Sequence, residues 1–280
     1  MGIWGGDGWR LEKSENKDNV NIVIGAYRSI LHPIAYMSLP ITSGKRCYEV
    51  LDKHKVKSMD ELIKKDKDLL YGEIIKPNIE EGLVLAERLA EKSVLPVVAP
   101  SIFEAKKQRW GQNDYMFMWF RVIEEKARKM YMKNGWEYSN GGSEEFVRAM
   151  EMQFGFINPG NGMEHFPKGT DLERVYKELR QIKVFNEDEG ELRLHDGFKM
   201  IKKAVLDLKE RGFSSPTLCE SLEKLATINA YFEDPMTVCV FDREAFNRIP
   251  YEVEKSVNRE FFGNKELMNF ARETREKINS

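Results

Sequence analysis

The residues best suited to chemistry lie in one short stretch, in which a polar glycine loop precedes two carboxylates. Residues 139–143 read Ser-Asn-Gly-Gly-Ser, and Glu144 and Glu145 follow at once in the first turn of an expected helix. Unpaired N–H groups of such a loop and the positive end of the helix dipole both favour a bound anion. A carboxylate in that turn is also favoured in its ionised form. The stretch therefore predicts an anion site with a reactive carboxylate beside it.

A second interpretation of the same two carboxylates is purely structural. Glu144 and Glu145 could complement the dipole of their own helix, an effect of about 0.3–1 kcal/mol for each side chain. Residue types and spacing alone leave both interpretations open.

A second polar turn follows the first clear strand of the chain. That strand is expected over residues 34–41, with Pro40 marking its end, and Thr42, Ser43, Lys45 and Arg46 come directly after it. Hydroxyls, a glycine and cations at the carboxyl end of a strand are suited to binding phosphate. An ordinary solvated turn is the alternative.

The pattern of apolar segments predicts an α/β protein with a doubly wound parallel sheet, Rossmann-like or flavodoxin-like. Strands and amphipathic helices alternate, which is typical of βαβ units. Asn78 is expected to cap the first crossover helix, with Glu81 three residues later. The expected strands are 34–41, 94–100, 129–132, 154–157 and 182–185, and the expected helices are 58–75, 78–92, 115–126, 143–154 and 171–181.

Three regions differ in character along the chain. Residues 1–30 are interpreted as an N-terminal arm, the first twenty being glycine-rich and charged; residues 31–190 form the α/β domain. Residues 191–280 form an added C-terminal helical region, with helices expected over 195–211, 216–232 and 265–278. This last region could cap the sheet or provide an oligomerisation surface.

The composition excludes several classes of protein. The 280 residues are 41% hydrophobic and 32% charged, and the net charge of −2 lacks the basic excess expected of a protein that binds nucleic-acid polymers. No segment has the signal-peptide or membrane-span pattern, so we expect a cytoplasmic protein that does not bind membranes. The three cysteines and four histidines are scattered, which predicts no metal site and no disulfide framework.

The stretch from Gly135 to Ala149 resembles the signature of the nucleoside 2-deoxyribosyltransferase superfamily, which includes the nucleoside 5′-monophosphate N-glycosidases. Seven residues fall in register on that signature: Gly135, Trp136, Glu137, Ser139, Gly141, Glu145 and Ala149. Tyr36 and Pro40 match the pattern of the superfamily's first strand. The resemblance covers residues 34–157, and Arg128 stands where relatives usually carry an aspartate.

The resemblance implies a catalytic site without a cofactor. Glu145 would be the nucleophile and Tyr36 would orient it by a hydrogen bond, while Asp114, chosen from its position in a loop, would assist the leaving base. The residues expected to bind substrate are Ser139, Gly141, Gly142, Ser143, Pro40, Thr42, Ser43, Lys45, Arg46 and Trp110. Trp110 or Trp119 is expected to stack on the base, a choice made from position along the chain.

The expected activity is cleavage or transfer of the N-glycosidic bond of a small (deoxy)nucleoside 5′-monophosphate. Its transition state resembles an oxocarbenium ion, which a carboxylate can stabilise or capture as a sugar ester. The alternatives are a non-catalytic nucleotide-binding or sensor domain, and a structural protein in which the glycine loop is only a loop. Relatives are commonly oligomers, so a homo-oligomer is expected.

Overall fold

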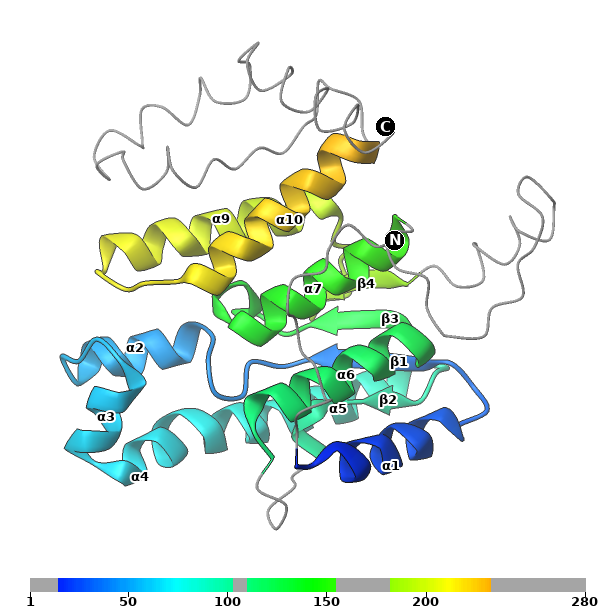
Figure 1. Cartoon of the computed structure of the whole chain (residues 1–280), viewed down its shortest axis with the longest axis horizontal. Helices are drawn as coiled ribbons and strands as arrows, with labels where there is room; N and C mark the ends of the chain where they lie inside the picture. Colours follow the sequence, from blue (N-terminus) through cyan, green and yellow to red (C-terminus); the bar gives the residue numbers. More distant parts are fainter. Residues whose placement is uncertain (1–14, 103–109, 155–181, 233–280) are drawn as a thin grey trace.

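A four-stranded parallel sheet lies at the centre of the molecule (Figure 1). The computed structural model describes residues 15–102, 110–154 and 182–232. The strand order is β2-β1-β3-β4, and every neighbouring pair is parallel. The strands are β1 (Ile34–Ser38), β2 (Val97–Val98), β3 (Ala127–Met132) and β4 (Lys183–Asn186). The expected doubly wound α/β fold is confirmed.

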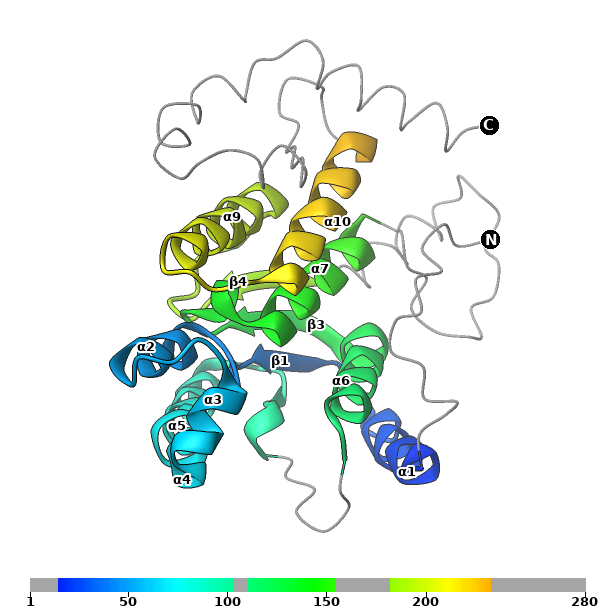
Figure 2. The ribbon, with the colours of Figure 1, turned by 60° about the vertical axis from the view of Figure 1, so that its left-hand side comes forward.

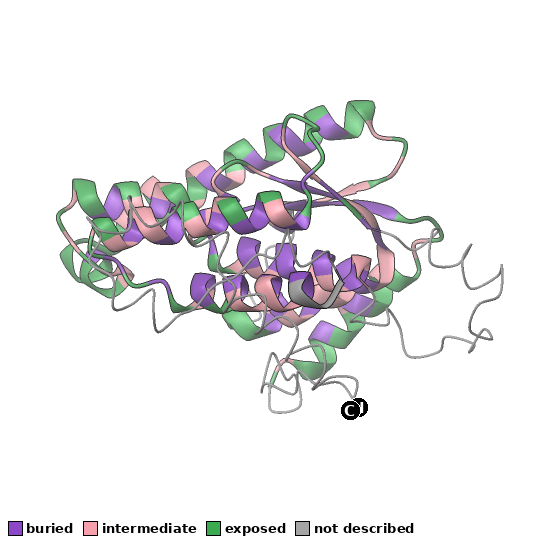
Figure 3. Cartoon of the chain, turned by 90° about the horizontal axis from the view of Figure 1, so that it is seen from above, coloured by how far each residue is buried: buried purple, intermediate pink, exposed green. Residues whose placement is uncertain are grey.

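The central strand β1 is buried on both faces, as is typical of a parallel sheet covered by helices. Its side chains alternate between two apolar clusters. Tyr36 belongs to the larger cluster, whereas Ala35 and Met37 belong to the smaller one. Burial colours show the same pattern, with purple strands between helices that are green on their outer sides (Figure 3).

One face of the sheet is covered by α5 (Lys76–Lys92), whose Leu85, Ala86 and Leu89 belong to the smaller cluster. This helix corrects one expectation from the sequence. Asn78 is no N-cap, because the helical backbone continues into α5 from η2 (Leu70–Ile75), a π-helical segment. The Asn78 amide instead donates to the carbonyl of Ile41, 3.0 Å away, and so joins α5 to the loop after β1.

The other face carries most of the helices. The helices α6 (Gln112–Lys126) and α7 (Asn140–Gln153) pack against each other, and α1 (Lys17–Arg28) packs on α6. Helices α9 (Leu194–Glu210) and α10 (Pro216–Phe232) pack on α7. In Figure 2, α7, α9 and α10 lie above the strands, α6 and α1 lie to the right, and α5 lies at the lower left. Val20 and Ile24 of α1 are buried, so residues 17–20 are part of a packed helix rather than a loose arm.

Smaller elements complete the carboxyl edge of the sheet. Helix α2 (Lys45–Lys53) follows β1, and α3 (Met59–Lys65) and α4 (Lys67–Leu69) lead into η2, so the expected helix over 58–75 is divided into three pieces. The 3₁₀ turns η3 (Pro100–Ile102) and η4 (Trp136–Tyr138) follow β2 and β3. None of the helices in the described ranges combines the length and apolar character needed to cross a membrane.

The C-terminal region shares the larger apolar cluster with the sheet. Phe198, Ile201 and Leu222 of α9 and α10 belong to the same cluster as Met130 of β3. The helices expected over 195–211 and 216–232 are confirmed, and Gly212 has the positive φ of +75° that suits the end of a helix. The helices expected over 171–181 and 265–278, and residues 155–157 of one expected strand, lie outside the described residues.

Candidate active site

A buried carboxylate held by two hydroxyl groups lies between β1 and α7. The Tyr36 hydroxyl donates to Oε1 of Glu145 over 2.6 Å, and Ser38 Oγ donates to Oε2 over 2.5 Å. Tyr36 and Ser38 are two residues apart on one strand, so both side chains leave the same face of the sheet. Glu145 is 5% exposed. The predicted hydrogen bond from Tyr36 is therefore present, and Ser38 is a second donor that the sequence argument missed.

The protonation of Glu145 differs from the expectation. Burial raises the pKa of this carboxyl to about 7, the hydroxyls of Ser38 and Tyr36 oppose that rise, and the charge of Glu144 adds to it. The prediction that the helix start favours ionisation is wrong, because α7 begins at Asn140 and Glu145 lies in its second turn. The dipole effect falls off within one turn, so burial determines the direction of the shift.

The position of this carboxylate agrees with a general rule for open parallel sheets. The chain leaves β1 towards β2 on one side, whereas β3 lies on the other side of β1. The loops after β1 and β3 therefore diverge at the carboxyl ends of these two strands. Such a switch point is where ligands of doubly wound sheets bind. Tyr36 and Ser38 belong to β1, one of these two strands, and Glu145 lies on α7, the helix that follows the other.

The two loops after β1 and β3 are in contact. Ser43 Oγ lies 2.9 Å from Ser139 Oγ, and a Cβ on Gly44 would lie 3.5 Å from the carbonyl oxygen of Gly135. Gly44 and Gly135 both have positive φ, a conformation that favours glycine. The two polar turns identified in the sequence therefore come together at the switch point.

The glycines of the predicted loop belong to the first turn of α7. Ser139 is the N-cap: its Oγ accepts the N–H of Gly142 over 3.2 Å, and its carbonyl accepts the N–H of Ser143 over 2.9 Å. These two N–H groups are not available to an anion, which corrects the expectation. Within the described ranges, the N–H groups of Asn140 and Gly141 have no acceptor.

The side chain of Ser143 also differs from its expected role. It is fully buried, donates to the carbonyl of Asn140 over 2.9 Å and accepts from Ser221 of α10 over 3.1 Å. The hydroxyl therefore faces the C-terminal helices. The next residue on α7, Glu144, is half-buried.

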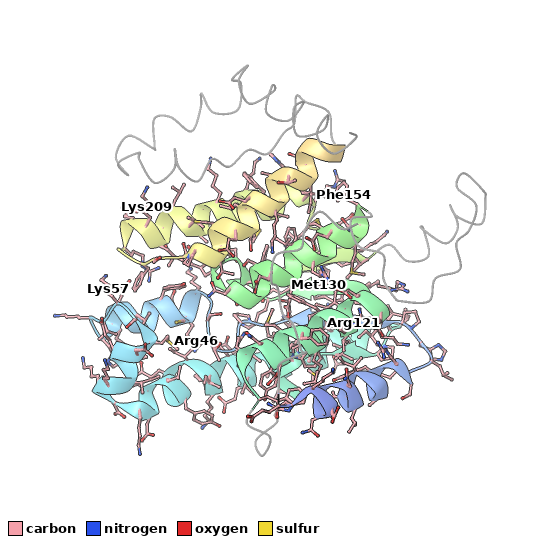
Figure 4. All side chains as sticks on the ribbon, in the orientation of Figure 1. Arg46, Lys57, Arg121, Met130, Phe154 and Lys209 are labelled. Carbon is pink, nitrogen blue, oxygen red and sulfur yellow. The ribbon has the colours of Figure 1, made fainter. Side chains whose placement is uncertain are left out.

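The cations after β1 take two different positions. Lys45 is the first residue of α2 and is exposed beside Gly135. Arg46, labelled in Figure 4, forms an ion pair with Glu81 of α5, and Lys133 contacts the same carboxylate over 2.9 Å. Arg46 was predicted to bind substrate, whereas the structure pairs it with Glu81 of α5. The other two residues of this loop that were predicted to bind substrate differ in exposure: Thr42 is exposed and Pro40 is buried.

The predicted helpers of the leaving base lie at the start of α6. The carboxylate of Asp114 accepts the N–H of Gly111 over 3.0 Å and the side-chain amide of Asn16 over 2.9 Å, so it caps α6. Trp110 packs beside Tyr115, with ring centroids 5.3 Å apart. Met116 of the same helix lies against Gly141, which brings this end of α6 to the first turn of α7.

One further carboxylate of the sequence signature lies near the site. Oε2 of Glu137 is buried and has no hydrogen-bond partner within the part of the chain that the structure describes. Burial raises the pKa of this carboxyl, and the charges of Lys45 and Lys203 oppose that rise. Trp136 beside it is fully buried and stacked on Phe146, as expected for a packing residue.

Comparisons with known proteins add no relative. No protein-family model, no curated protein and no solved structure matches this chain. In the ranges that the structure describes, no group of three or more histidine, cysteine, aspartate or glutamate side chains is arranged to hold a metal ion.

Proposed function

We propose that this protein cleaves or transfers the N-glycosidic bond of a small (deoxy)nucleoside 5′-monophosphate, with Glu145 as nucleophile. The supporting observation is a carboxylate that accepts hydrogen bonds from Tyr36 and Ser38 at the switch point of a parallel sheet. The resemblance of residues 135–149 to the superfamily signature supports the same assignment of Glu145. The activity would need no cofactor.

The charge balance around Glu145 suits this chemistry. Among the described residues, no cationic side chain contacts this carboxylate, and its two hydrogen-bond donors are neutral hydroxyls. An ionised Glu145 would therefore keep its full charge for an oxocarbenium-like sugar. Two hydroxyl donors satisfy one lone pair on each oxygen and fix the orientation of the carboxylate, while leaving other lone pairs for attack.

The proposed reaction is a double displacement. An oxygen of Glu145 forms a bond to the anomeric carbon while the bond from that carbon to the base nitrogen breaks. The base leaves with the electron pair and takes up a proton from solvent or an acidic side chain. Water, or a second base, then attacks the same carbon, loses a proton to solvent and releases the Glu145 carboxylate.

The phosphate end of the nucleotide would lie at the two touching loops. Ser43 and Ser139 supply hydroxyls there, Lys45 supplies a positive charge, and the N–H groups of Asn140 and Gly141 point along the start of α7. A phosphate at a helix N-terminus is favoured by both the N–H donors and the dipole. This arrangement motivates the monophosphate, rather than the free nucleoside, as substrate.

A non-catalytic nucleotide-binding domain is the alternative, and one observation favours it. Glu145 is only 5% exposed, so a sugar must displace part of its cover before the carboxylate can react. A protein that only binds nucleotides would keep the same loops and would show no dependence on this carboxylate.

The test is release of free base from a panel of ribo- and deoxyribonucleoside 5′-monophosphates, measured by chromatography. Wild-type protein should release base from at least one nucleotide, and Glu145→Gln should abolish release. Glu144→Gln is the matched control, because Glu144 is the adjacent and half-buried carboxylate on the same helix. If the wild-type protein and both variants bind a nucleotide and none of them releases base, the alternative is favoured.

A further inference from the structure

The C-terminal helix α10 contacts the first turn of α7, the helix that Ser139 caps. Ser221 Oγ donates to Ser143 Oγ over 3.1 Å, and Ser143 Oγ donates to the carbonyl of Asn140 over 2.9 Å. Ser143 and Ser221 are 0% and 1% exposed, so neither hydroxyl can exchange its partner for bulk water. Loss of a buried partner leaves an unsatisfied group, which costs about 1–3 kcal/mol. The first turn of α7 is thus tied to α10.

Helix α9 reaches the residue that precedes the same cap. Burial, and then the charge of Asp207, raise the pKa of Tyr138, so this carboxylate lies near the tyrosine hydroxyl. Arg211 pairs with the same carboxylate over 2.8 Å. Arg211 also pairs with Asp52 at the end of α2 over 2.8 Å. The residue before Ser139 is therefore held by α9, and α9 is in turn tied to the helix that follows β1.

Close packing makes this arrangement stiff. A Cβ on Gly197 of α9 would lie 2.1 Å from the ring of Phe146, so α9 and α7 are in contact with no room for a side chain. Phe146 is stacked on Trp136 of η4, with centroids 4.8 Å apart. Figure 1 shows α9 and α10 beside α7 on the far side of the molecule from α5. A shift of either C-terminal helix would therefore move η4 and α7.

We propose that α9 and α10 form a brace that fixes Ser139, and that Asp207 and Ser221 are positioning residues for it. Asp207 holds the segment before Ser139, and Ser221 holds the segment after it. Ser139 in turn contacts Ser43 of the other loop and caps the helix that carries Glu145. The inference rests on the proposed function for what Ser139 binds, whereas the bracing contacts do not depend on it.

The first experiment compares Ser221→Ala with Thr227→Ala in the full-length protein. Thr227 lies on the same helix, and its hydroxyl donates to the carbonyl of Glu223, its one partner among the described residues. Loss of one buried hydrogen bond, about 1 kcal/mol, should raise KM for the nucleoside monophosphate about fivefold in Ser221→Ala. The kcat should stay within twofold, and Thr227→Ala should change neither constant. The double variant Ser143→Ala/Ser221→Ala should match Ser143→Ala alone, because Ser221 acts through Ser143.

The second experiment uses a more exposed pair, so that a folding defect at Ser221 cannot hide the result. Asp207→Asn weakens the contacts of both Tyr138 and Arg211, whereas Asp52→Asn affects Arg211 without touching Tyr138. Asp207→Asn should raise KM for the monophosphate and speed amide hydrogen exchange over residues 137–142. Asp52→Asn should leave exchange over that segment at the wild-type rate.

The two proposals fail in different ways. If wild-type protein releases no base from any nucleotide, the proposed function fails, and hydrogen exchange still tests the brace. If wild-type protein is active while Ser221→Ala and Asp207→Asn keep wild-type KM and wild-type exchange over 137–142, the brace is overturned and the activity stands.

Discussion

Two glutamates at the same edge of the sheet have opposite surroundings. Glu145 is buried between the hydroxyls of Tyr36 and Ser38, and its pKa is raised to about 7. Glu81 has a half-exposed side chain between Arg46 and Lys133. Partial burial alone would raise the pKa of Glu81, but the hydrogen bond and charge of Lys133, together with Arg46, lower it.

Two cations neutralise the charge of Glu81, whereas the described partners of Glu145 are neutral. Cations around Glu81 hold its charge in ion pairs of the kind that surfaces use, each contributing about 0–1 kcal/mol. Glu145 has only neutral donors within the described residues, so its charge is costly and uncompensated. A buried carboxyl whose pKa is raised to about 7 is typical of a functional group rather than a stabilising one.

The largest expected effect compares the two carboxylates directly. Glu145→Gln should lower base release by about a thousandfold or more, because the attacking oxygen is lost. Glu81→Gln should lower base release less than about threefold. Glu81 pairs with Arg46 and Lys133, whereas Glu145 is held by two hydroxyls of β1. Initial rates of base release measure both, and equal losses in the two variants would contradict the contrast.

Removal of one hydroxyl donor should have the next largest effect. Tyr36→Phe and Ser38→Ala each delete one hydrogen bond to Glu145, and such a bond to a charged group contributes about 1.5–3 kcal/mol. The pKa of Glu145 should rise by about one unit or more in each variant. Base release at pH 7 should fall about fivefold or more, because a smaller fraction of Glu145 is ionised, with recovery at pH 9. Unchanged pH profiles would show that the hydroxyls do not act on Glu145.

The pH profile of the wild-type protein should report the same carboxylate. A nucleophile must be ionised, and the pKa of Glu145 is about 7, so kcat/KM should rise as the pH increases from 5.5 to 8. Glu144→Gln removes a neighbouring negative charge and should move the midpoint of this rise to lower pH. A profile that falls over this range would instead indicate Glu145 acting as an acid.

Stability should show a smaller and opposite effect. The folded-state pKa of Glu145 is raised from 4.5 to about 7, so its ionisation costs folding free energy above pH 7, about 3 kcal/mol, and none below pH 4.5. Glu145→Gln should therefore gain stability relative to wild type between pH 5 and pH 8, measured by urea unfolding at each pH. Glu81→Gln should change stability by less than about 1 kcal/mol.

The fold could be predicted because it depends on local pattern, whereas the contact between Tyr36 and Glu145, 109 residues apart, was predicted from the resemblance. Alternating apolar segments define the strands, and the strand end at Pro40 and the loop before Glu145 both lie at the carboxyl edge of a parallel sheet. Ser38 could also have been found, since it is two residues from Tyr36 and leaves the same face.

Other features depend on packing that the sequence does not reveal. Gly141 and Gly142 disfavour a helix, yet α7 includes both. A Cβ on Gly142 would lie 2.9 Å from the carbonyl oxygen of Trp136, so packing leaves no room for a side chain there. That earlier start of α7 moves Glu145 to the second turn and uses the N–H groups of Gly142 and Ser143. Arg46 and Glu81 are 35 residues apart in the sequence, so no local pattern predicts their ion pair.

The most direct test of the central claim is mass spectrometry of the protein quenched in acid during turnover of its nucleotide substrate. The account predicts a sugar-phosphate ester on the peptide that contains Glu145, present in wild type and in Glu144→Gln and absent in Glu145→Gln. Base release in the wild type without an adduct on that peptide, or base release that persists in Glu145→Gln, would contradict it.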